Sequence, residues 1–130
     1  MPNESRPLRV LVVDDEPLIC WALAETLGAA GDIVAEADSA KGAIHALTNA
    51  PEPTDVVILD YQLPDSHDLG LLAKVRQLSP QSQVILMSVH CTPDVAKEAL
   101  GIGAYRVLNK PLDMDDVPAL VRDAACSRLG

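Results

Sequence analysis

Short aliphatic runs alternate with longer stretches of helical periodicity along this 130-residue chain. A strand buried on both faces of a parallel sheet reads as an unbroken apolar run, and a helical crossover joins each parallel strand to the next. The pattern therefore predicts an α/β fold with five βα units around a parallel sheet. We expect the strands at Leu8–Val13, Ile33–Ala37, Val56–Asp60, Gln83–Ser88 and Tyr105–Asn109.

Proline and capping residues indicate where several helices begin. Pro17 is expected in the first turn of the first helix, where its missing N–H costs nothing. Ser39 and Thr92 are expected N-caps. Because a proline deep in a helix clashes with the preceding turn, Pro118 places the start of the last helix near Asp115.

Length and composition are typical of one globular domain, expected over residues 1–130 with an ordered core from about 8 to 129. Ten basic and nineteen acidic residues give a net charge of −9, which disfavours direct binding to nucleic acid. No apolar run is long enough to span a membrane, and the N-terminus lacks a signal-peptide pattern. The odd number of cysteines, Cys20, Cys91 and Cys126, indicates free thiols and a cytoplasmic location.

Charged residues stand at the carboxyl ends of three of the expected strands: Asp14 and Asp15, Asp60, and Lys110. Ligands of open α/β sheets bind at this edge, so we expect the four side chains to meet there. Like charges this close call for a cation, and oxygen-only ligands favour Mg²⁺ over Zn²⁺ or Ca²⁺. A carboxylate beside a divalent cation, an amine and the hydroxyl of Ser88 is suited to attack a phosphoryl group, which makes Asp60 the candidate nucleophile.

Four sequence motifs carry a resemblance over nearly the whole chain. They are Val12-Val13-Asp14-Asp15-Glu16, Ile58-Leu59-Asp60-Tyr61-Gln62-Leu63-Pro64, Leu86-Met87-Ser88 and Asn109-Lys110-Pro111. With these motifs the chain resembles the response-regulator receiver domains of bacterial two-component signalling, the chemotaxis receivers among them. The resemblance implies a flavodoxin-like five-stranded sheet of order 2-1-3-4-5 with five helices.

The resemblance also implies the roles of individual residues. Asp60 would be the phosphorylated residue, with Ser88 and Lys110 as its catalytic and sensing partners. Asp14, Asp15, Asp60 and the backbone carbonyl of Gln62 would hold Mg²⁺. The peptide bond before Pro111 would be cis.

Such a domain accepts phosphate from a sensor histidine kinase or a phosphotransfer protein and catalyses its own dephosphorylation, without independent metabolic turnover. The added charge would shift the conformational equilibrium of a face made of the fourth helix, the fifth strand and the fifth helix. An output domain or downstream protein, a phosphorylation-dependent homodimer and transcription regulation are the implied consequences, with no membrane partner.

Five residues are expected to modulate the switch. Val107 stands where the family usually has an aromatic residue, and Tyr105, two positions earlier, is expected on the same side of the strand. Either Tyr105 takes over part of that role or aromatic gating is absent. Val89 stands where the family usually has alanine or glycine and is expected to narrow access to Asp60, while Gln62 and His90 would line the path of the attacking water.

The first helix carries candidate partner-binding residues. Ile19, Leu23 and Leu27 recur every four positions and should face the sheet, which turns Trp21 and the neighbouring Leu18 outward. In the family this helix docks the kinase, so Leu18 and Trp21 are candidate anchors of that interface.

Two alternatives belong to other functional classes. The first is a Mg²⁺-dependent hydrolase with Asp14 as nucleophile and Glu16 as acid, although 130 residues leave little room for a substrate-binding cap. The second is a degenerate receiver that binds partners independently of phosphorylation, which the complete set of required groups disfavours. A nucleotide-binding role lacks a glycine-rich phosphate loop.

Overall fold

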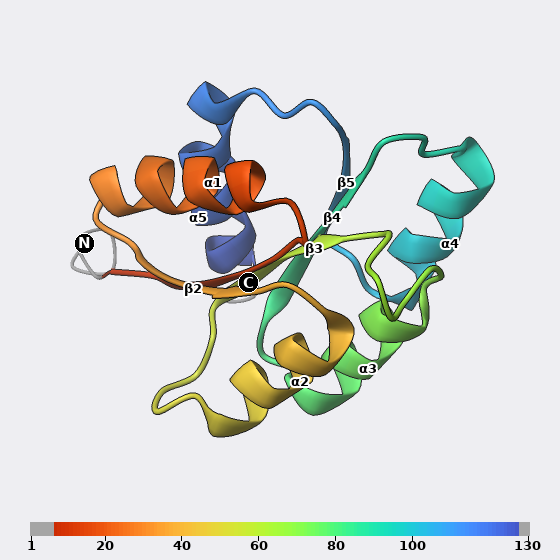
Figure 1. Cartoon of the computed structure of the whole chain (residues 1–130), viewed down its shortest axis with the longest axis horizontal. Helices are drawn as coiled ribbons and strands as arrows, with labels where there is room; N and C mark the ends of the chain where they lie inside the picture. The colour runs from red at the N-terminus through yellow and green to blue at the C-terminus, as the bar shows by residue number, and fades with distance from the viewer. Residues whose placement is uncertain (1–6, 128–130) are drawn as a thin grey trace.

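The computed structural model describes residues 7–127, which form a parallel five-stranded sheet between two layers of helices (Figure 1). The strand order is β2-β1-β3-β4-β5, as expected. The strands are β1 (Arg9–Val13), β2 (Ile33–Ala37), β3 (Val56–Asp60), β4 (Gln83–Ser88) and β5 (Arg106–Asn109). Three agree with the predicted ranges, whereas β1 and β5 each begin one residue later than predicted. Residue 129, the expected end of the core, lies outside the described residues.

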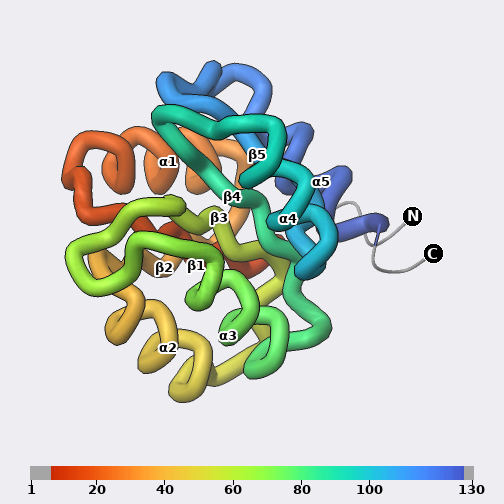
Figure 2. The backbone as a smooth tube through the Cα atoms, turned by 90° about the vertical axis from the view of Figure 1, so that its right-hand side faces the viewer, coloured from red at the N-terminus to blue at the C-terminus, as the bar shows by residue number. Residues whose placement is uncertain are grey.

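The helices follow the strands in strict alternation. They are α1 (Pro17–Ala29), α2 (Ala40–Asn49), α3 (Gly70–Leu78), α4 (Pro93–Ile102) and α5 (Val117–Ser127), with a short 3-10 helix, η2 (Met114–Asp116), before α5. Helices α1 and α5 cover one face of the sheet, and α2, α3 and α4 cover the other (Figures 1 and 2). This is the doubly wound arrangement that the alternation of strand and helix patterns predicts.

Strand alternation divides the core into two apolar clusters. Val10, Val12 and Ile58 face α1 and α5, where Leu23 and Leu27 of α1 are fully buried. The intervening residues of the same strands face α2, α3 and α4. Every residue of β3 is buried, as expected for the central strand of a parallel sheet covered on both faces.

The capping residues lie where the sequence predicts them. Ser39 Oγ accepts a hydrogen bond from Gly42 N at 2.9 Å, and Thr92 Oγ1 accepts one from Val95 N at 3.2 Å. The last helix was expected to begin near Asp115, but residues 114–116 form a 3-10 turn and the α-helix begins two residues later than expected, at Val117. Pro118 is thus in the first turn, where proline is tolerated.

Tyr105 corrects one expectation. It packs against the cluster under α1 and α5, whereas Val107 packs against the cluster on the opposite face. The expectation that the two share a side assumed strand alternation from Tyr105 onward, but β5 begins only at Arg106. The expectation that Tyr105 lies on the same side as Val107 is therefore wrong.

The fold brings the ends of β1, β3, β4 and β5 to one edge of the sheet, where the predicted site residues follow. Among the described residues, no helix is both long and apolar enough to cross a membrane.

Candidate functional site

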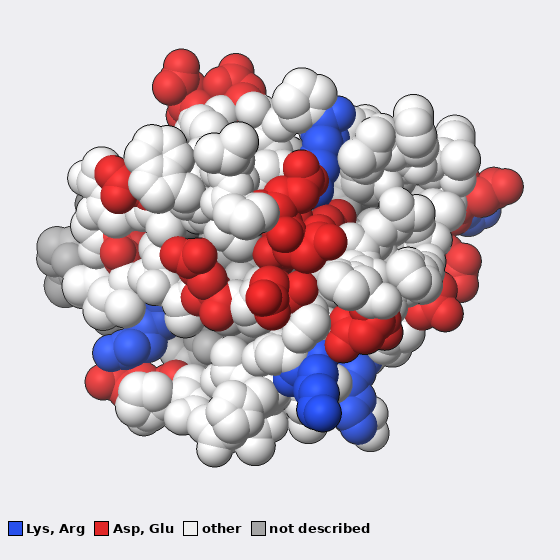
Figure 3. Space-filling model, in the orientation of Figure 1, with Lys and Arg blue, Asp and Glu red and all other residues white. Residues whose placement is uncertain are grey.

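Three carboxylates converge at the carboxyl edge of the sheet. One oxygen from each of Asp14, Asp15 and Asp60 lies within 4.8 Å of the other two. Asp14 and Asp60 are buried and Asp15 is exposed, so the cluster opens to solvent on one side. Figure 3 shows acidic side chains gathered in the middle of the corresponding face, over the ends of β1 and β3. The parallel strands thus deliver the acids to one point, as their position in the sequence predicts.

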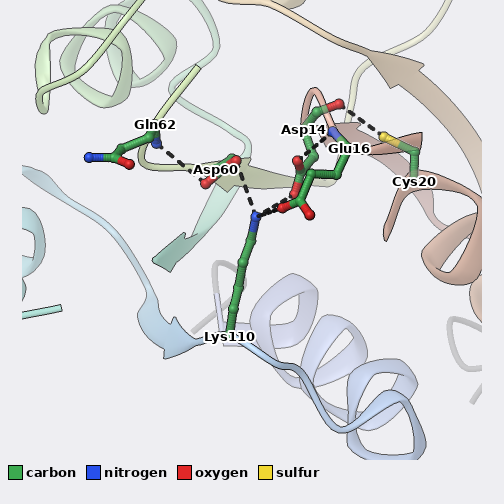
Figure 4. Close-up of polar contacts among 6 residues, drawn as sticks. All are labelled: Asp14, Glu16, Cys20, Asp60, Gln62 and Lys110. Atoms are coloured by element: carbon green, nitrogen blue, oxygen red, sulfur yellow. Dashed lines mark hydrogen bonds and ion pairs between the residues drawn. The ribbon is translucent and has the colours of Figure 1, made fainter. Parts of the chain in front are cut away.

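The ammonium group of Lys110 lies against these carboxylates (Figure 4). Its Nζ atom is 2.9 Å from Asp14 Oδ2, 2.9 Å from Glu16 Oε1 and 3.2 Å from Asp60 Oδ2. The Lys110 side chain is only 7% exposed. The Lys110–Pro111 peptide bond is cis, the isomer that the resemblance implies.

Burial and neighbouring charge shift the titration of this group of residues. Burial, together with the charge of Asp14, raises the pKa of Asp60 to about 6, against the opposing effects of Lys110 and of the Gln62 N–H. Burial lowers the pKa of Lys110, but the adjacent carboxylates of Asp14 and Glu16 outweigh it, and the net pKa is above its usual range. The amine is therefore a permanent cation beside a carboxylate that resists ionisation.

Asp14 shows that the cluster suits a further cation. Its Oδ2 atom is buried and accepts no hydrogen bond of good geometry among the described residues, although it contacts Lys110 as an ion pair. Its Oδ1 atom accepts a hydrogen bond from Glu16 N at 2.9 Å, which orients the carboxylate. A buried oxygen without a hydrogen bond, beside two further carboxylates, fits a hard divalent cation such as Mg²⁺.

The thiol of Cys20 forms a hydrogen bond with the backbone at the end of β1. Its Sγ donates to the backbone oxygen of Asp14 at 3.1 Å, as Figure 4 shows. Burial and the charges of Asp14 and Glu36 raise the pKa of this thiol to about 11. Cys20 is therefore a protonated, unreactive donor in this position.

A cavity of about 410 Å³ adjoins the cluster. Ser88, which is 3% exposed, lines it together with Asp60 and Lys110. Val89 and Gln62 also line it, and Gln62 N donates to Asp60 Oδ1 at 3.3 Å. The cavity is large enough for a phosphoryl group, and the Asp60 carboxylate is part of its lining.

Other predicted residues lie away from this cavity. His90 is exposed and does not line it, and neither Tyr105 nor Val107 reaches it. Leu18 and Trp21 are 79% and 63% exposed on α1, as the helical periodicity predicts.

Sequence reasoning missed Glu16 as a partner of Lys110, and Tyr61 and His67 as lining residues of the cavity. One signal for Glu16 was available. It directly precedes Pro17 at the N-cap position, where glutamate is not among the preferred residues, and its side chain makes no capping hydrogen bond.

The comparisons with known proteins agree with this geometry. The family model for the response regulator receiver domain matches residues 10–122. The chain is 36% identical to the DNA-binding transcriptional regulator NtrC of Escherichia coli over 115 residues, which are 88% of this chain and 24% of that protein. It is 36% identical to the response regulator protein PilR of Pseudomonas aeruginosa over 116 residues, which are 89% of this chain and 26% of that protein. The chain thus spans about a quarter of the length of these relatives.

Solved structures share the fold. A CheY-like receiver domain protein from Methanospirillum hungatei superimposes with a TM-score of 0.88 at 23% identity, covering 95% of this chain and 98% of that one. The beryllofluoride-activated NtrC4 receiver domain dimer superimposes with a TM-score of 0.84 at 30% identity, covering 92% of this chain and 98% of that one. None of these comparisons favours the hydrolase or the degenerate receiver. With its sheet order, its cluster of strand-end acids and this match, the chain belongs to the response regulator receiver domain family.

Proposed function

We propose that Asp60 is the residue on which this receiver domain accepts a phosphoryl group. The observation that carries the proposal is the contact between Asp60 Oδ2 and Lys110 Nζ at 3.2 Å, at the mouth of a cavity next to two further acids. A nucleophilic carboxylate needs nearby positive charge to accept the added charge of the phosphoryl group.

The donor is a phosphohistidine of a sensor kinase or phosphotransfer protein. A carboxylate oxygen of Asp60 attacks phosphorus, the P–N bond breaks, and the imidazole leaves with the electron pair. The product is an acyl phosphate on Asp60. Lys110 meets one phosphoryl oxygen with its ammonium group, and the Ser88 hydroxyl, which lines the same cavity, donates to another.

Asp14, Asp15, Asp60 and the backbone carbonyl of Gln62 would hold Mg²⁺. When bound, this ion neutralises charge on the phosphoryl oxygens during in-line transfer. The buried Asp14 Oδ2 atom, which lacks a hydrogen bond, supports this ligand set.

Phosphorylation with a small donor tests the proposal. The protein is incubated with acetyl phosphate and Mg²⁺ and its intact mass is measured. We expect one added phosphoryl group in the wild-type protein and none in Asp60→Asn. Stoichiometric phosphorylation of Asp60→Asn, or labelling that persists in EDTA, would contradict the assignment.

The output proposal rests on the regulators that the chain resembles. We place the protein in the cytoplasm, as the receiver part of a transcription regulator that acts through an attached or separate output partner. The face of α4, β5 and α5 is the proposed switch surface, and a hollow lined by Leu108, Leu112 and Leu120 lies on it. The dimeric state of the activated NtrC4 receiver supports a phosphorylation-dependent homodimer on this chain.

Trp21 and Leu18 on α1 are the proposed anchors for the kinase. Both are exposed apolar side chains, and large aromatic residues dominate the energetics of protein interfaces. A Trp21→Ala variant should keep its labelling by acetyl phosphate and lose affinity for the phosphohistidine protein. Unchanged affinity for the kinase would contradict this docking site.

A further inference from the structure

The ammonium group of Lys110 contacts three carboxylates, through hydrogen bonds to Glu16 and Asp60 and an ion pair with Asp14. A lysine ammonium offers three N–H donors and no acceptor, and the three contacts of Nζ are with Asp14, Glu16 and Asp60. A phosphoryl group on Asp60 also needs Lys110. The phosphoryl group therefore competes with the present contacts for this ammonium group.

Burial indicates which contact is released. The Asp14 side chain is 0% exposed, and removing one partner of a buried ion pair leaves an uncompensated buried charge. The contact with Asp60, whose side chain is 7% exposed, passes to the phosphoryl group that Asp60 then carries. The Glu16 side chain is 57% exposed, so water can replace Lys110 at its carboxylate at little cost. Figure 4 shows Glu16 approaching Lys110 from the β1 side, opposite Gln62.

Among the described residues, the Glu16 side chain makes no hydrogen bond or ion pair with any residue other than Lys110. It occupies the N-cap position of α1 without capping the helix, and only its backbone groups bond to Asp14 and to the first turn of α1. Its carboxylate extends across the site to a residue 94 positions later in the chain. The contact thus connects the start of α1 to the loop after β5.

We propose that Glu16 is a positioning residue that holds Lys110 in the unphosphorylated protein and competes with the phosphoryl group for it. This proposal rests on the function proposed above, because it concerns the same reaction at Asp60. Glu16 thereby slows phosphorylation, and its release of Lys110 is part of the switch.

Two substitutions of Glu16 distinguish the loss of its contact with Lys110 from the loss of its negative charge. Glu16→Asp keeps the negative charge but withdraws the carboxylate by about 1.5 Å, the length of one C–C bond, so that the 2.9 Å contact is lost. Glu16→Gln removes the charge and the ion pair. Because aspartate is a preferred N-cap residue, Glu16→Asp does not endanger α1. Asp38→Asn, which removes one exposed charge from a neighbouring hollow without touching Lys110, is the matched control.

The rate of labelling by acetyl phosphate at saturating Mg²⁺ is the first measurement. We expect both Glu16 variants to label about two- to fivefold faster than wild type, the range set by an exposed ion pair, and Asp38→Asn to label at the wild-type rate. A faster Glu16→Gln with an unchanged Glu16→Asp would overturn the proposal, since repulsion of the anionic donor would then explain the effect. Slower labelling in both would also overturn it, because Glu16 would then hold Lys110 in the productive position.

The second measurement needs no metal and no reaction. In EDTA, the Nζ resonance of Lys110 in NMR spectra should shift in both Glu16 variants and stay in place in Asp38→Asn. An unshifted resonance in both would show that the contact does not hold Lys110. If wild type labels on Asp60 while the Glu16 variants match it, only the present proposal fails; if wild type does not label, the proposed function fails.

Discussion

Asp60 is buried in a cluster of acids, so its ionised carboxylate lowers the free energy of unfolding when no metal is bound. Burial and Asp14 raise its pKa from 3.8 to about 6, so the folded protein disfavours the ionised form. Converted at 1.36 kcal/mol per pKa unit, the ionised carboxylate costs the fold about 3 kcal/mol above pH 6. Asp60→Asn should therefore stabilise the metal-free protein.

The pH dependence of this gain follows from the direction of the shift. Below about pH 3.8 Asp60 is protonated in both folded and unfolded chains, and no cost arises. The cost grows as the pH rises through the interval up to about 6, and it is complete above that. Asp60→Asn should raise the free energy of unfolding by about 3 kcal/mol at pH 7.5 and by only about 1 kcal/mol at pH 4.5.

Urea unfolding in EDTA at the two pH values measures this difference. Asp123→Asn, an exposed acid on α5, is the control and should change the free energy of unfolding little at either pH. An equal gain at both pH values would mean that amide packing, and not the charge of Asp60, is responsible. A loss of stability at pH 7.5 would refute the reasoning outright, because the contact with Lys110 would then outweigh burial.

Three further predictions concern the metal, the cavity wall and a helix cap. Mg²⁺ at about a hundredfold its Kd should raise the free energy of unfolding by about 2.7 kcal/mol, with a much smaller rise in Asp14→Asn; an equal rise in that variant would contradict the ligand set. Val89→Ala should label faster with acetyl phosphate, since the exposed Val89 side chain lines the cavity; an unchanged rate would mean that it does not restrict entry. Thr92→Ala should lose about 1 kcal/mol in urea unfolding and Thr92→Ser little, because both threonine and serine can cap Val95 N; equal stability of all three would exclude a contribution from this cap.

The strand ends were predictable from sequence because a change from apolar to charged residues marks them. Asp14, Asp60 and Lys110 each follow an apolar run, and parallel strands place such residues at one edge regardless of side-chain detail. The helix start at Pro17 was predictable for a similar reason, since proline restricts the backbone locally.

The direction of individual side chains was not predictable in the same way. Tyr105 faces the opposite cluster from Val107 because β5 begins one residue later than the apolar run suggests, and period-2 alternation holds only within a strand. The reach of Glu16 to Lys110 depends on the path of the loop after β5, which local sequence patterns do not describe.

The position of Tyr105 bears on how a signal leaves the site. With valine at position 107 and Tyr105 turned to the other face, no aromatic side chain on β5 links Ser88 to the switch surface. The backbone offers a direct link instead. Ser88 pairs with Asn109 in the β4–β5 ladder, and Lys110 N donates to Ser88 O at 2.9 Å. Any inward movement of Ser88 toward a phosphoryl group therefore pulls on the end of β5, whose next residue is Lys110 itself. The two residues proposed to contact the phosphoryl group are thus joined by a backbone hydrogen bond, and they should move together.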